Sequence, residues 1–165
     1  AGALGDIYEG VKRPGHFDGV LTVVNRLFEL VKPQWAIFGE KDFQQMTLIK
    51  SMKSNVEIIG APTIRDTDGL ALSSRNVRLS DPKAALVIYR ALLAASKEKS
   101  IDSAREVMRG VLASEAAFTL DYAEIINESN FEKASPSDAN KRAIIAGWVN
   151  GIRLIDNMPM NGGAQ

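Results

Sequence analysis

The chain contains no cysteine and only one histidine among its 165 residues. Without thiols it can form neither a disulfide framework nor a thiolate metal site. A single histidine cannot supply a histidine-rich metal site either. We therefore expect no disulfides, no redox chemistry through thiols and no metal site built by the protein alone.

The chain also lacks an excess of either charge, since lysine plus arginine and aspartate plus glutamate each number 20. A balanced chain has no bulk attraction to nucleic acid or to an anionic membrane. No apolar run approaches the roughly 18 to 20 residues of a membrane span, and residues 1–10 do not resemble a signal peptide. These absences predict a cytoplasmic protein without a nucleic-acid or membrane partner.

The first part of the chain alternates between helical and strand patterns. Apolar residues recur at three- and four-residue steps over residues 17–31, which predicts a helix that ends before Pro33. Residues 35–38 (WAIF) form a short apolar run closed by Gly39, typical of a parallel strand covered on both sides. Helical spacing resumes at Phe43, and residues 56–59 predict a second strand.

This alternation predicts part of a doubly wound parallel sheet, whose ligands bind at the carboxyl ends of the strands. Two strands are too few for such a sheet, and a bare edge favours aggregation. We therefore expect partner strands from residues upstream of Ala1 or from another chain.

The second part changes character after residues 65–69, which we interpret as a turn and hinge between domains. Two helices are predicted, the first begun by Ser80, Asp81 and Pro82 and the second capped by Asp102. A strand is predicted near residues 120–125. Asn150-Gly151 then predicts a tight hairpin between residues 143–149 and 152–155, and we expect the tail 161–165 to be frayed.

These patterns predict an α/β plus α+β architecture. Residues 1–64 form the remaining part of a Rossmann-like nucleotide-binding domain with a partial parallel sheet. Residues 65–165 form a small C-terminal domain of helices and an antiparallel sheet.

The segment from Gly39 to Asp42 (GEKD) lies at the predicted strand-to-helix turn. Free N–H groups at a helix N-terminus favour an anion, and Lys41 adds a positive charge. Gly39 would let a ligand approach the backbone, and Asp42 could accept hydrogen bonds from ribose. The same residues also fit a capped helix with a solvated lysine.

Ser73, Ser74 and Arg75 offer hydroxyl groups and a guanidinium fork, which suit the terminal phosphates of ATP. A polar turn before the next helix is the alternative. Gln44 and Gln45 could orient a substrate or simply face water. His16 could contact a ligand or carry a proton.

Three segments, read in order, carry a resemblance to a known family: residues 13–17 (RPGHF), 38–45 (FGEKDFQQ) and 68–76 (DGLALSSRN). Their combination is similar to the signature segments of the pantothenate synthetase family. Residues 153–157 (RLIDN) also resemble that family's last strand. The resemblance implies a nucleotidyltransferase-type Rossmann fold followed by a C-terminal lid domain.

The resemblance further implies a carbon–nitrogen ligase that joins pantoate to β-alanine through a pantoyl adenylate, using ATP with Mg²⁺ and releasing AMP and pyrophosphate. The implied ATP contacts are Phe38, Gly39, Lys41, Asp42, Ile64, Leu72, Ser73, Ser74 and Arg75. Among these, the implied catalytic residues are Lys41, Ser73, Ser74 and Arg75. Gln45 is implied to bind pantoate, and His16 and Arg13 to lie near the acid or amine substrate.

One departure from the family pattern stands out, because its His-x-Gly-His motif does not occur in this sequence. We therefore expect a C-terminal portion that is inactive alone, taken from an enzyme that forms a homodimer. A nucleotidyltransferase that activates another acid remains an alternative, as does a non-catalytic dimerisation or binding module.

Overall fold

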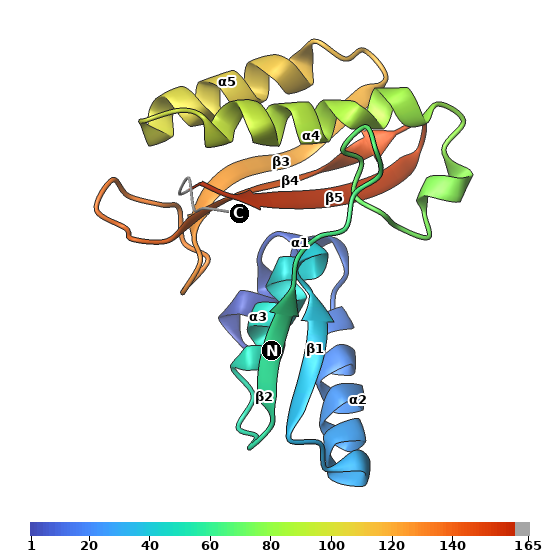
Figure 1. Ribbon diagram of the computed structural model, residues 1–165, viewed down its shortest axis with the longest axis vertical. Helices are drawn as coiled ribbons and strands as arrows, with labels where there is room; N and C mark the ends of the chain where they lie inside the picture. Colours follow the sequence, from blue (N-terminus) through green and yellow to red (C-terminus); the bar gives the residue numbers. More distant parts are fainter. Residues whose placement is uncertain (161–165) are drawn as a thin grey trace. The chain divides into compact units, whose positions relative to one another are not determined.

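A computed structural model describes residues 1–160, so the predicted frayed tail lies outside the described residues. The chain divides into two compact units, Ala1–Thr63 and Ile64–Gln165. Figure 1 shows the helices and strands of both units. The functional roles assigned above to the two domains remain predictions.

The first unit alternates helices and strands as predicted. Its elements, in chain order, are η1 (Ala3–Asp6), α1 (Glu9–Lys12), α2 (His16–Val31), β1 (Trp35–Gly39), η2 (Glu40–Asp42), α3 (Phe43–Lys50) and β2 (Glu57–Ala61). The strands pair in parallel, with Trp35 opposite Glu57 and Gly39 opposite Ala61. Helix α2 ends at Val31 and is capped by Lys32, just before Pro33. Lys32 has a left-handed backbone (φ 50°), and its N–H donates to the carbonyl of Phe28.

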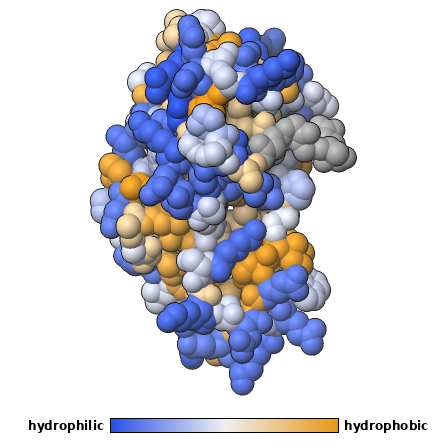
Figure 2. Space-filling view, turned by 90° about the vertical axis from the view of Figure 1, so that its left-hand side faces the viewer, coloured by the Kyte–Doolittle hydropathy of each residue, from blue (hydrophilic) through white to orange (hydrophobic). Residues whose placement is uncertain are grey.

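The prediction that β1 is covered on both sides is wrong for the described chain. Trp35 and Ile37 are 56% and 58% exposed, because alternate residues of a strand point to opposite faces and only one face is covered. The stripe of α2 is likewise buried only in part: Val24 is buried, but Leu27 is 51% exposed. On the face drawn in Figure 2, hydrophobic areas lie among hydrophilic ones.

The second unit packs two helices against an antiparallel sheet, as Figure 1 shows. Its elements are η3 (Asn76–Arg78), α4 (Pro82–Ser96), α5 (Ile101–Ala113), β3 (Phe118–Asn127), β4 (Lys141–Val149) and β5 (Ile152–Pro159). The strand order is β3-β4-β5. Fully buried side chains from both helices and from the sheet share one core, among them Val87, Leu92, Met108, Ile125, Ile145 and Val149.

The helix starts differ in one respect from the prediction. Asp81 caps α4 as expected, accepting a hydrogen bond from the Lys83 N–H at 3.0 Å. Helix α5 is capped by Ser100, which accepts from the Ser103 N–H at 3.1 Å, whereas Asp102 lies in its first turn. The predicted cap at Asp102 is therefore wrong. Ser100 lies in the extended conformation typical of a cap residue, which leaves its hydroxyl free to turn back to the helix.

The predicted hairpin between the last two strands is confirmed. Asn150 and Gly151 both have positive φ angles, 49° and 78°. These angles belong to the tight turn whose twist matches that of paired strands.

The boundary between the two compact units falls between Thr63 and Ile64, and residues 65–69 lie at the beginning of the second unit. Asp66 Oδ1 accepts hydrogen bonds from the N–H groups of Asp68 and Leu70, at 3.0 and 2.8 Å. The segment is thus a hydrogen-bonded turn. Within residues 1–160, no helix is both long and apolar enough to cross a membrane.

Two glycine substitutions should change the stability of the second unit in opposite directions. Gly151→Ala forces a Cβ into the left-handed region and should cost about 1–2 kcal/mol. Gly110 lies in α5, and the Cβ added by Gly110→Ala would meet no atom within 4 Å. It should stabilise by about 0.5–1 kcal/mol, because alanine loses less backbone entropy than glycine in a helix. Urea unfolding followed by circular dichroism measures both, and equal stability of the two variants would contradict the predicted turn strain.

Candidate functional site

The first group of predicted site residues surrounds the junction between β1 and α3. Strand β1 ends at Gly39, the turn η2 follows, and α3 begins without a side-chain cap. Gly39 has φ −69°, which any residue adopts, so a left-handed backbone is not the reason for a glycine here. A Cβ added at Gly39 would meet no atom within 4 Å, so the space beside its backbone is open. Lys41 is partly exposed and Asp42 exposed at the same turn.

The two adjacent glutamines of α3 differ completely in their surroundings. Gln44 is 5% exposed, and its side-chain amide donates to the carbonyls of Leu4 and Ile7 at 2.8 and 2.9 Å. Its Oε1 accepts from the Glu9 N–H at 3.1 Å. Gln44 is therefore a structural residue that holds the N-terminal segment. Gln45 is partly exposed and makes no such bonds within the described residues, so its amide remains able to bind a substrate.

Arg13 directly follows α1 and His16 is the first residue of α2, and Gly15 between them takes the left-handed conformation that the turn requires. The pKa of His16 is lowered, first by burial and then by the positive charge of Arg13. The charges of Glu9 and Asp42 act in the opposite direction. Tertiary structure therefore brings His16 within electrostatic reach of the β1–α3 junction. A neutral imidazole there can accept a proton.

The second group begins with a short hairpin in the second unit. Arg65 and Ala71 form an antiparallel bridge, and the Leu72 N–H donates to the Ile64 carbonyl at 2.9 Å. Directly opposed residues of an antiparallel pair project to the same face. Ile64 and Leu72 are 71% and 52% exposed, so together they present an apolar surface suited to the face of a planar ring.

The segment Ser73 to Arg75 follows this hairpin without interruption. Ser73 Oγ accepts from the Arg75 N–H at 3.2 Å, and Ser74 is exposed. The Arg75 guanidinium donates to the Arg153 carbonyl of β5 at 3.0 Å, which leaves it further N–H groups. Asn76 donates to the Ala71 carbonyl at 3.0 Å, while its Oδ1 is buried without a partner among residues 1–160. The segment is thus ordered by its own side chains.

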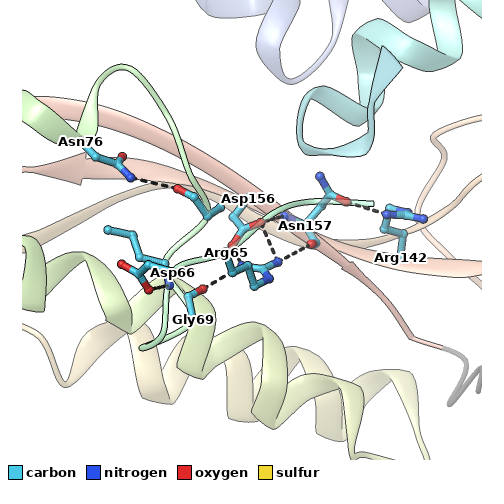
Figure 3. A network of polar contacts seen from close by, with 9 residues as sticks. Arg65, Asp66, Gly69, Asn76, Arg142, Asp156 and Asn157 are labelled. Carbon is cyan, nitrogen blue, oxygen red and sulfur yellow. Dashed lines mark hydrogen bonds and ion pairs between the residues drawn. The ribbon is translucent and has the colours of Figure 1, made fainter. Parts of the chain in front are cut away.

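A polar network that sequence reasoning missed connects the hairpin to β5 (Figure 3). Arg65 forms a double hydrogen-bonded ion pair with Asp156, and the adjacent Asn157 accepts from Arg142 at 2.6 Å. One signal could have revealed it. Asp156 lies two residues after Leu154 on a strand of the core sheet, so both side chains point to the same, inward face. A buried carboxylate requires a cation. The sequence does not say which cation.

The described residues contain no group of three or more histidine, cysteine, aspartate or glutamate side chains that could hold a metal. They therefore do not provide a metal cage of their own. A pocket of about 310 Å³ lies elsewhere, beside the start of α5, and is lined by residues that include Ser100, Arg105, Lys141 and Met160. It contains none of the predicted site residues.

Comparison with known proteins shows what this arrangement is similar to. A family model described as Pantoate-beta-alanine ligase matches residues 1–159. The chain is 45% identical to a pantothenate synthetase of Acidothermus cellulolyticus, over 97% of this chain and 57% of that protein. It is 46% identical to one of Thermus thermophilus, over 95% of this chain and 60% of that protein. The chain therefore spans somewhat less than two thirds of the length of these relatives.

Solved structures agree with the sequence relatives. The crystal structure of pantothenate synthetase from Thermus thermophilus matches with a TM-score of 0.93 and 44% identity, over 97% of this chain and 62% of that one. A pantoate-beta-alanine ligase from Francisella tularensis, complexed with beta-gamma ATP and beta-alanine, matches with a TM-score of 0.69 and 33% identity, over 97% and 56%. These matches confirm the predicted fold class, and this chain belongs to the pantoate-beta-alanine ligase family.

Proposed function

We propose that the residues of this chain serve the ATP-dependent condensation of pantoate with β-alanine, through a pantoyl adenylate. One observation carries the proposal. The hairpin places the exposed side chains of Ile64 and Leu72 side by side, and the Ser73 to Arg75 segment continues from it. An apolar surface joined to hydroxyl and guanidinium groups suits a nucleotide, since it pairs a site for the base with one for phosphates.

In the first step, a pantoate carboxylate oxygen attacks the α-phosphorus of ATP, and pyrophosphate leaves. Negative charge develops on the phosphate oxygens, where Lys41 and Arg75 are proposed to stabilise it together with the start of α3. Asp42 would hold the ribose beside Gly39 and Phe38, and Gln45 would orient pantoate. Any Mg²⁺ would arrive on the ATP phosphates, because the described residues offer no cage for it, and no step here depends on it.

In the second step, the β-alanine amine attacks the acyl carbon of the adenylate, and AMP leaves. The amine must lose its proton before it attacks. His16 has a lowered pKa and can accept that proton, while Arg13 can pair with a carboxylate. No covalent enzyme intermediate is needed, so catalysis rests on positioning and electrostatics.

We also propose that this chain alone does not complete the reaction, and that the complete ligase is a homodimer. Two facts support the first point: the family's His-x-Gly-His motif does not occur in the sequence, and the chain spans 57% of its Acidothermus relative.

Pantoate-dependent exchange of labelled pyrophosphate into ATP tests the function. We expect exchange from a hybrid that joins this chain to the part of the Thermus thermophilus relative that the match leaves out, and none from the chain alone. Lys41→Ala should lower the hybrid's rate about 100-fold, as expected for loss of a charge that stabilises the transition state. Lys50→Ala, at the exposed end of α3, is the matched control and should leave the rate unchanged.

Several outcomes would contradict the proposal. Exchange that requires a different acid would indicate a nucleotidyltransferase of other specificity. No exchange with any acid, together with no ATP binding at millimolar concentration, would indicate a non-catalytic module. Exchange by the chain alone would refute its proposed inactivity.

Substitutions of the two glutamines of α3 should have different effects, one on stability and the other on substrate binding. Gln44→Ala leaves the Leu4 and Ile7 carbonyls and the Glu9 N–H without their partner, and should destabilise the first unit by about 2 kcal/mol. Gln45→Ala should change stability by less than about 0.5 kcal/mol but raise the hybrid's KM for pantoate. Thermal unfolding and steady-state kinetics measure the two effects. The reverse pattern would exclude Gln45 from the pantoate site.

The single histidine allows a direct test of the electrostatics at the β1–α3 junction. An NMR titration should place the pKa of His16 below 6.5. Arg13→Gln should raise that pKa because it removes a neighbouring positive charge, and Asp42→Asn should lower it because it removes a negative one. An unchanged pKa of His16 in both variants would show that burial alone lowers it.

A further inference from the structure

Arg65 is the most extensively bonded side chain of the predicted nucleotide hairpin. Its Nη1 and Nη2 donate to the two carboxylate oxygens of Asp156, at 2.6 and 3.0 Å. They also donate to the Gly69 carbonyl at 3.1 Å and the Asn157 carbonyl at 3.3 Å. The side chains of Arg65 and Asp156 are only 18% and 5% exposed. A planar fork thus joins the hairpin to β5 in one orientation.

The turn of the hairpin is also packed against α4. The Arg65 guanidinium lies over the Tyr89 ring, 4.9 Å from its centre. Gly69 has φ +99°, and a Cβ added there would come within 2.1 Å of the same ring. The hairpin is therefore held between β5 on one side and Tyr89 on the other.

The residues proposed to bind the nucleotide in the second unit lie close to this attachment in the chain. Ile64 precedes Arg65, and Leu72 is paired with Ile64. The Ser73 to Arg75 segment comes next, and Arg75 makes its own bond to the carbonyl of Arg153, also on β5. The hairpin and the phosphate-binding segment are thus fastened to the same strand at two points.

A buried ion pair is a poor source of net stability, because desolvation offsets most of the attraction. Its advantage over an apolar contact is direction: two parallel N–H···O bonds fix both the position and the angle of the guanidinium. Resting on the function proposed above, we propose that Arg65 and Asp156 are positioning residues for ATP, which hold the Ile64–Leu72 surface and the Ser73 to Arg75 segment in register on β5.

Hydrogen exchange on this chain tests the positioning without any enzyme assay. Asp156→Asn keeps the shape of the side chain but removes its charge. It should speed exchange at least about tenfold for the protected amides of the hairpin and the following segment, because local opening becomes easier. Those amides belong to Leu72, Asn76, Arg78 and Leu79. Amides of β4 should exchange at the parent rate.

Glu124→Gln is the matched control, since Glu124 is 6% exposed and pairs with Arg105 at 2.5 Å in the same unit. It should leave the hairpin amides unchanged. Arg65→Lys keeps the charge but loses the fork, so it should reproduce the effect of Asp156→Asn even if that variant unfolds. Parent-rate exchange of the hairpin amides in either folded variant, or an equal increase in Glu124→Gln, would overturn the proposal.

The kinetics of the hybrid ligase provide a second measurement, which distinguishes positioning of the nucleotide from a loss of stability alone. Arg65→Lys should raise KM for ATP about tenfold while KM for pantoate stays unchanged, since only nucleotide contacts are displaced. A looser hairpin with unchanged KM for ATP would refute the positioning of nucleotide. An inactive parent hybrid would refute the ligase function, and the exchange measurement would still decide whether the pair holds the segment.

Discussion

One long-range ion pair joins the beginning of the second unit to its end. Arg65, at the beginning of the unit, is bound to Asp156 on its last strand, 91 residues later. Both helices and the other two strands lie between these residues in the chain. The pair therefore links the first hairpin of the unit to its last strand. Its two parallel N–H···O bonds favour one alignment of that hairpin with β5.

Stability and alignment come from different residues in this unit. Side chains of α4, α5 and the sheet form the apolar core, and their burial is the main favourable term in folding. Apolar contacts have little directional preference, so they do not by themselves fix a short hairpin at the edge of the core. The bonds of Arg65 and the stacking on Tyr89 supply that direction. A rigid hairpin is what a phosphate-binding segment requires, because catalysis by positioning fails when groups are misplaced by about 1 Å.

The first unit follows a different principle. The parallel pairing of β1 and β2 brings Gly39 and Ala61 to the same end of the sheet, and the turn into α3 occurs there. Gln44 secures the N-terminal segment against this helix from within, whereas the side chain of the adjacent Gln45 is partly exposed. Two glutamines in sequence thus differ in their surroundings, because they occupy different sides of a short helix, and the binding role of Gln45 remains a proposal.

Local patterns in the sequence were sufficient for the elements and for the fold class. Helix α2, the Asp81 cap and the Asn150-Gly151 turn depend on residues only a few positions apart, and so they could be predicted. The Asp102 cap was wrong because the helix already begins at Ile101, capped by Ser100, which places Asp102 in the first turn.

The roles of the site residues remain predictions, because their motifs indicate chemistry without geometry. Only the tertiary structure decided that Gln44 is buried, that Ile64 lies beside Leu72, and that Arg65 pairs with Asp156. The physical reason is that a hydrogen-bonding partner distant in the chain is selected by the packing of whole elements. Periodicity and capping signals in the sequence indicate which kind of partner each side chain requires. They do not indicate which residue is that partner.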